Sequence, residues 1–193
     1  MKIGLYFGTF NPIHIGHLII ANHMAEYSGL DQIWMVVTPQ NPNKQKNSLL
    51  EDYHRLHMVH LATEDYLKIK PSDIEFKLAQ PNYTVDTLAY LEEKFPNHVF
   101  SLIMGEDNLN SFHKWKNYEV ILQSHDIFVY PRLNQDTINH QFINHQKIHK
   151  IEAPVLELSS TFIRKNIKEG KNIIPMLPKK VWEYIEHNLF YKK

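Results

Sequence analysis

Two histidines three residues apart are the first side chains that could carry out chemistry. His14 and His17 lie in the segment 8–17, whose sequence is GTFNPIHIGH, between an apolar stretch and a stretch with helical character. In a turn from a strand into a helix, free backbone N–H groups favour anions, and residues three apart share one face. Gly8 and Gly16 allow close approach of the backbone to a ligand. The segment therefore indicates a site for phosphate oxygens.

A second polar segment lies far downstream, at Leu158–Arg164. Ser159, Ser160 and Thr161 offer hydroxyls and amides at a helix start, and Arg164 follows one turn later, where it can reach a phosphate. Each segment also has an ordinary interpretation. A histidine pair can cap or pack a helix, and a Ser/Thr cap followed by a surface arginine is common. The interpretation of the histidine pair as a metal site has weaker support, because no third ligand is evident nearby.

The composition narrows the function classes. Lysine plus arginine and aspartate plus glutamate both number 21, so the formal net charge is zero, which argues against a broad nucleic-acid-binding surface. The absence of cysteine excludes disulfides, thiolate metal sites and cysteine nucleophiles. No long apolar run indicates a signal peptide or a membrane span, so we expect a cytoplasmic protein without membrane contact.

Alternating apolar stretches and helical patterns predict a doubly wound α/β fold with a parallel sheet. We expect one domain, residues 1–193, with a small helical C-terminal part. Strands are predicted at 2–7, 32–38, within 69–78, and at 99–104, 126–130 and 154–158. Helices are predicted at 15–27, 160–168 and 178–188. Two further helices are predicted to begin at Ser48, which forms a capping-box pattern with Glu51, and at Thr84, a candidate cap. The stretch 134–150, rich in Asn, Gln and His, permits no firm assignment.

Both polar segments resemble parts of a known signature. His14–His17 resembles the (H/T)-x-G-H motif of the nucleotidyltransferase superfamily, and Ser159–Arg164 resembles the Ser-Ser-Thr-x-x-Arg segment of its adenylyltransferases. Four further segments, 39–44, 82–88, 105–109 and 112–118, are similar in order to blocks of bacterial nicotinate-mononucleotide adenylyltransferases. Phe7 and Asn11 depart from the family's usual Gly and Asp, and the usual Pro-Pro-His-Lys form of the lysine loop is absent.

The resemblance implies transfer of the adenylyl group of ATP to nicotinate mononucleotide, giving deamido-NAD and pyrophosphate in NAD biosynthesis, with Mg²⁺ accompanying ATP. It implies that the tryptophan at 115 stacks on the pyridine ring, and that amides near residue 84 hold its acid group. The implied catalytic residues are His14, His17 and Arg164. The implied ATP contacts are Gly8, Thr9, Phe10, Gly16, Gly105, Asp107, Ser159, Ser160 and Thr161. The implied substrate contacts are Lys44, Thr84, Trp115 and Tyr118, and Arg132 is a further candidate anion contact; no metal-ligating residue is implied.

Competing functions remain open at this point. Another adenylyltransferase could act on phosphopantetheine or nicotinamide mononucleotide, and a non-catalytic nucleotide-binding module is a rival of another class. A tRNA synthetase is disfavoured by the length of the chain and by its charge balance. Three histidines, His54, His57 and His60, suggest zinc, although solvated surface residues are the better interpretation. The oligomeric state, a homo-oligomer included, is left open.

Overall fold

The computed structural model describes residues 1–39, 49–133, 142 and 144–192. Its centre is a six-stranded sheet in the order β3-β2-β1-β4-β5-β6, and every neighbouring pair of strands is parallel. The strands are β1 (Lys2–Gly8), β2 (Gln32–Val37), β3 (Ile69–Ser72), β4 (Val99–Gly105), β5 (Ile127–Tyr130) and β6 (Ile148–Lys150). This is the doubly wound arrangement that the alternating pattern predicted.

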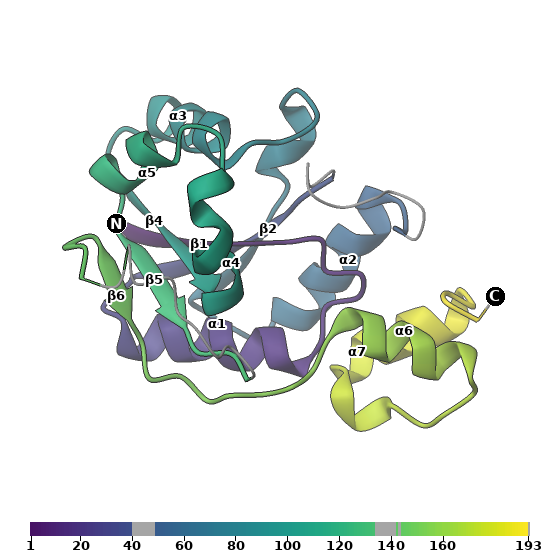
Figure 1. Ribbon diagram of the computed structural model, residues 1–193. Helices are drawn as coiled ribbons and strands as arrows, with labels where there is room; N and C mark the ends of the chain where they lie inside the picture. The colour runs from purple at the N-terminus through teal and green to yellow at the C-terminus, as the bar shows by residue number, and fades with distance from the viewer. Residues whose placement is uncertain (40–48, 134–141, 143, 193) are drawn as a thin grey trace.

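Helices cover both faces of the sheet (Figure 1). Helices α1 (Ile15–Tyr27) and α2 (Asp52–Thr63) share one apolar cluster with the sheet, and α3 (Thr84–Lys94), α4 (Glu106–Ser111) and α5 (Tyr118–Ser124) share the other. Short 3₁₀ turns occupy Ile74–Lys77, Phe112–Lys114 and Ile174–Met176. None of the helices in the described ranges is long and apolar enough to cross a membrane.

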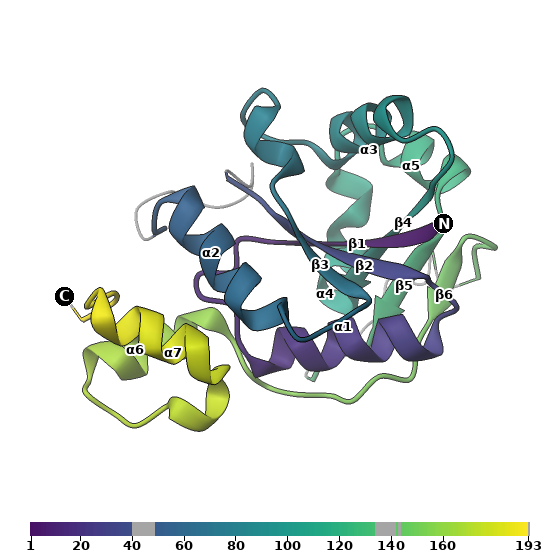
Figure 2. The ribbon, with the colours of Figure 1, turned by 180° about the vertical axis from the view of Figure 1, so that it is seen from behind.

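The C-terminal helices α6 (Ser160–Lys168) and α7 (Lys179–His187) form a lobe at one side of the sheet, next to α2 (Figures 1 and 2). Their buried residues, among them Ile163, Val181 and Ile185, belong to the same apolar cluster as α1 and α2. The lobe, formed by residues 160 onward, therefore packs on helices from the first half of the chain.

The β strands read as continuous apolar runs because both of their faces are covered. Ile3 and Leu5 of β1 are fully buried on one face, and Tyr6 lies in the cluster of the opposite face. The chain leaves β1 toward β2 and later returns on its other side to β4, so the topological switch point lies between β1 and β4. Ligands of such folds bind at the carboxyl ends of the strands at this point.

Three local predictions need correction. Helix α2 begins at Asp52 with Glu51 as its N-cap, so Glu51 is not the third residue of a capping box, and Ser48 lies outside the described residues. Tyr83, not Thr84, is the N-cap of α3, and its side chain makes no capping hydrogen bond.

The third correction concerns the predicted last strand. Residues 154–158 form no strand; the chain runs past α1 to α6 there (Figures 1 and 2), with Val155 and Leu156 exposed. The sheet edge is instead occupied by Ile148–Lys150, which pairs with β5. An apolar run becomes a strand only where a neighbouring strand can accept its hydrogen bonds.

Candidate active site

A cavity of about 820 Å³ lies at the carboxyl ends of the central strands. The histidine segment and the Ser-Ser-Thr segment, about 150 residues apart in the chain, line it together. The predicted residues that line it are Gly8, Thr9, Phe10, His14, Gly16, His17, Thr84, Asp107, Trp115, Arg132, Ser159, Ser160, Thr161 and Arg164. The fold therefore brings most of the predicted site residues to one place.

The turn between β1 and α1 presents the histidine pair to this cavity. Directly after β1, Phe10 is almost fully buried and has a φ of 44°, in the left-handed region. His14 is the N-cap of α1, in extended conformation, and His17 is its third helical residue. Their rings stack, with centroids 3.7 Å apart and an interplanar angle of 23°. A Cβ at position 16 would lie 3.1 Å from Nδ1 of His14, so glycine there leaves room for the stacked ring.

The two histidines differ in their surroundings. The backbone N–H of His14 donates to Nδ1 of His17, 3.2 Å away, so His17 also caps the helix, as the ordinary interpretation of the pair expected. Burial, assisted by the positive charge of Arg132, lowers the pKa of His14 to about 3. His14 is therefore a neutral imidazole at physiological pH, and it can act by donating a hydrogen bond.

Direct hydrogen bonds join the second segment to the first. The Ser160 hydroxyl donates to the carbonyl of Pro12 (2.9 Å), and the Arg164 guanidinium donates to the carbonyl of Asn11 (2.8 Å). The Ser159 hydroxyl caps α6 by accepting from the backbone of Phe162. The positively charged Arg164 is thereby held beside the histidine turn, which is the relation the two motifs predicted.

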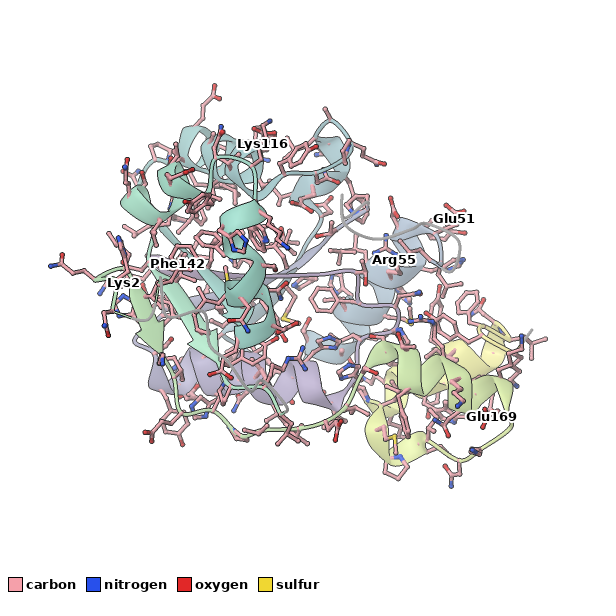
Figure 3. All side chains as sticks on the ribbon, in the orientation of Figure 1. Lys2, Glu51, Arg55, Lys116, Phe142 and Glu169 are labelled. Atoms are coloured by element: carbon pink, nitrogen blue, oxygen red, sulfur yellow. The ribbon has the colours of Figure 1, made fainter. Side chains whose placement is uncertain are left out.

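Arg55 is a component of the site region that sequence reasoning missed. This side chain comes from α2 (Figure 3) and is fully buried. It donates to the carbonyls of Thr9 (2.6 Å), Thr38 (3.0 Å) and Leu50 (3.0 Å), with Asp52 as its ion-pair partner. It thus ties the loop after β1 to the end of β2. Its position as a charged residue within the apolar face of a predicted helix could have revealed it from the sequence.

A polar chain forms the floor of the cavity near β4 and β5. The hydroxyls of Tyr6 and Tyr130 lie 3.2 Å apart, and Arg132 contacts both Tyr130 (3.5 Å) and the carboxylate of Asp107 (3.5 Å). Burial raises the pKa of both tyrosines, so both hydroxyls stay protonated. Gly105 does not line the cavity; a Cβ there would collide with Asp107, so glycine permits that carboxylate to fold back over the end of β4.

The far end of the cavity is lined by Thr84, Trp115 and the buried Glu75 and Asn82. Lys116 pairs with Asp86 in the first turn of α3 (2.9 Å), which ties the start of that helix to the segment that carries Trp115. Glu75 accepts a hydrogen bond from Thr87 at 2.8 Å, and burial raises the pKa of its carboxyl against this bond. The free amides at the start of α3 and a flat aromatic ring therefore share this end.

Tyr118 is a predicted substrate contact that does not line the cavity. Tyr118 packs against Phe112 and Phe142 in the apolar cluster under α5, with ring centroids 5.7 and 5.9 Å away. Lys44 lies outside the described residues. The three histidines of α2 form no metal cluster within the described ranges, and the rings of His54 and His57 pack near Tyr184.

Comparisons with known proteins agree with this geometry. The model of the cytidylyltransferase-like family matches residues 5–166, which include both motifs. A protein of Flavobacterium psychrophilum, named "Probable nicotinate-nucleotide adenylyltransferase", is 77% identical over 193 residues, all of both chains. A protein of Flavobacterium johnsoniae with the same name is 72% identical, again over all of both chains. The chain belongs to the nicotinate-nucleotide adenylyltransferase family.

A solved structure extends the likeness to the fold. Nicotinic acid mononucleotide adenylyltransferase of Plasmodium falciparum, complexed with NaAD, superposes with a TM-score of 0.83 at 23% identity, over 98% of this chain and 97% of that one. At this identity the likeness establishes the fold, and the relatives establish the family. The nicotinate-nucleotide adenylyltransferase fold thus includes the C-terminal lobe as well as the sheet.

Proposed function

We propose that this protein transfers the adenylyl group of ATP to nicotinate mononucleotide, giving deamido-NAD and pyrophosphate. One observation carries the proposal: the histidine turn and the Ser-Ser-Thr-x-x-Arg helix line one cavity and are joined by the Arg164–Asn11 and Ser160–Pro12 hydrogen bonds. Because the cavity is lined by residues of both β1 and α6, we assign the activity to the whole chain, residues 1–193, as one unit. We further propose that it acts in the cytoplasm.

In the proposed reaction an oxygen of the mononucleotide phosphate attacks the α-phosphorus of ATP. A new O–P bond forms, the bond from the α-phosphorus to the bridging oxygen breaks, and pyrophosphate leaves with the bonding electrons. The attacking oxygen is already anionic, so no general base is needed. The protein then contributes mainly by positioning the reactants and by stabilising charge on phosphate oxygens.

The geometry suggests a role for each polar group at the phosphate end. His14 and His17 donate hydrogen bonds to the phosphates, Arg164 supplies a fixed positive charge, and Ser159–Thr161 offer amides at the start of α6. Asp107 and Arg132, paired across the end of β4, are proposed to contact the adenosine and a phosphate, respectively. Thr9 and Phe10 contribute backbone groups of the turn.

The opposite end is proposed to hold the pyridine ring. Trp115 offers a face for stacking, and the amides after Tyr83 offer donors to a carboxylate at the positive end of α3. This arrangement favours the acid over the amide, because an amide offers only one oxygen to these donors. Lys44 is proposed, from the resemblance alone, to hold a phosphate on this side.

Mg²⁺ is proposed to enter with ATP. It prefers oxygen ligands and in nucleotide sites is bound largely by phosphates and water. Of the two acidic side chains that line the described part of the cavity, Asp107 is paired with Arg132 and Glu75 has a raised pKa. These residues fit a metal carried by the nucleotide better than one held in a protein cage.

Pyrophosphate release from ATP and Mg²⁺ tests the proposal, with nicotinate mononucleotide, nicotinamide mononucleotide and phosphopantetheine compared as acceptors. We expect kcat/KM to be highest by far for the nicotinate compound, with deamido-NAD as product. Preference for another acceptor would support adenylyl transfer but contradict nicotinate mononucleotide as the substrate. Nucleotide binding without pyrophosphate release from any pair would indicate a binding module.

A further inference from the structure

Asn11 is the point at which three distant parts of the chain meet. It is almost fully buried in the turn after β1, three residues before His14. Its backbone carbonyl accepts from Arg164 of α6 at 2.8 Å, and its side-chain Oδ1 accepts from the backbone of Leu50 at 3.3 Å, ahead of α2. Oδ1 also accepts from the hydroxyl of Tyr191, beyond the end of α7, at 2.8 Å.

Tyr191 is held in place for this contact. After α7 the chain turns back, with Leu189 and Tyr191 both at positive φ (56° and 64°), a conformation that is unfavourable for residues other than glycine. The backbone N–H of Phe190 closes the turn by donating to Ile185. A strained turn at the end of a helix persists only when contacts on its other side offset the strain.

The hydroxyl of Tyr191 lies in an unusual setting. Burial raises its pKa, while the positive charges of Arg164 and Arg55 oppose the shift. The group therefore stays a protonated donor and sits near both arginines: the one proposed to contact phosphate and the one that braces Thr9. An aromatic hydroxyl at this point can set the geometry of the histidine turn without touching a substrate.

We propose that Tyr191 is a positioning residue for adenylyl transfer: its hydroxyl fixes the side chain of Asn11, and thereby holds the Asn11 carbonyl on Arg164 and the histidine turn in its reactive arrangement. This inference rests on the proposed function for its kinetic consequences and on the contacts alone for its structural ones. The C-terminal lobe, in this account, completes the phosphate end of the site.

The variant Tyr191→Phe removes only the hydroxyl and keeps the ring beside Phe190. We expect kcat to fall about tenfold, the scale of one lost hydrogen bond, with KM for ATP within about twofold of the wild type. Hydrogen exchange of the amides in residues 8–17 should become faster. A role in stability alone would shift the melting temperature and leave kcat and this exchange unchanged.

Tyr184→Phe is the matched control. Tyr184 lies in α7, its ring is 5.7 Å from that of Phe190, and its hydroxyl is hydrogen-bonded to His54 at 2.7 Å, away from the cavity lining. It should affect the melting temperature at least as much as Tyr191→Phe does, with kcat and the exchange of residues 8–17 unchanged.

A double-mutant cycle with Asn11 completes the test. In the background Asn11→Ala, Tyr191→Phe should have no further effect on kcat, whereas in Asn11→Asp, which keeps an acceptor, its effect should persist. Equal kinetics and equal exchange in Tyr191→Phe and Tyr184→Phe would overturn the inference, as would additive effects with Asn11→Ala. Should the wild type make no deamido-NAD, the proposed function fails, and the exchange comparison still decides whether Tyr191 orders the turn.

Discussion

The backbone N–H of His14 donates a hydrogen bond to Nδ1 of His17 across 3.2 Å. A nitrogen that accepts carries no proton, so the proton of the His17 ring is on Nε2, and the stacked neighbour His14 is neutral because burial lowers its pKa to about 3. The pair therefore offers imidazole N–H donors to the cavity, beside the positive charge of Arg164.

Replacing His17 by alanine should lower kcat by about 10²–10³, the effect of removing one preorganised donor from a developing oxyanion. The fold should persist, because His17 is not a core residue. Steady-state kinetics and circular dichroism measure the two quantities. His23→Ala, on the same helix and beside Tyr27, should keep wild-type turnover. A folded His17→Ala protein with near-normal kcat would refute the assigned role.

The depressed pKa of His14 has a consequence for stability. Above pH 6.5 the ring is neutral in both the folded and the unfolded chain. Between about pH 6.5 and 3 only the unfolded chain binds the proton, so stability must fall as the pH is lowered through this window. At pH 5 the loss from this group is about 2 kcal/mol.

Urea unfolding of the wild type and of His14→Asn at pH 7 and pH 5 measures this loss. The wild type should lose about 2 kcal/mol more than the variant, because the other titrating groups cancel in the comparison. An equal loss in both proteins would show that His14 titrates normally in the folded state.

Arg55→Met should destabilise the protein strongly. It leaves the carbonyls of Thr9, Thr38 and Leu50 without their donor, and each unsatisfied buried acceptor costs about 1–3 kcal/mol. We expect the free energy of unfolding to fall by at least about 3 kcal/mol, measured with urea. His57→Ala, an exposed change on the same helix, should stay within about 0.5 kcal/mol. A similar result for the two variants would mean that the hydrogen bonds of Arg55 do not stabilise the fold.

The sequence predicted most of the sheet because buried parallel strands are continuous apolar runs, as in β1, β2 and β4. It failed where a tertiary contact decided the outcome. Residues 154–158 are apolar enough for a strand but have no strand partner, and Ile148–Lys150 is a strand because β5 lies beside it. Local pattern does not contain that information.

The site residues likewise divide into those that local motifs predict and those that depend on tertiary contacts. His14, His17 and Arg164 could be predicted because their motifs are short and ordered, and the fold brings them together. Arg55 and Tyr191 could not, because each acts through backbone or side-chain acceptors that are remote in sequence. The resemblance implies a ligand contact for Tyr118, whereas in the structure its ring packs on Phe112.

Substitutions of Trp115 and Tyr118 should therefore have different effects on KM for the mononucleotide. Trp115→Ala removes a stacking surface from the cavity, so KM for nicotinate mononucleotide should rise by about tenfold or more, with KM for ATP little changed. Tyr118→Leu should lower the melting temperature and leave both KM values near those of the wild type. A raised KM for the mononucleotide in Tyr118→Leu alone would reverse the two assignments.

The fate of the phosphorus atoms of ATP tests the central claim most directly. ATP labelled at the α-phosphorus, and separately at the γ-phosphorus, is incubated with the protein, Mg²⁺ and nicotinate mononucleotide, and the products are separated. We predict the α label in deamido-NAD and the γ label in pyrophosphate. An α label in AMP, or a γ label in orthophosphate, with an unlabelled dinucleotide fraction would contradict adenylyl transfer.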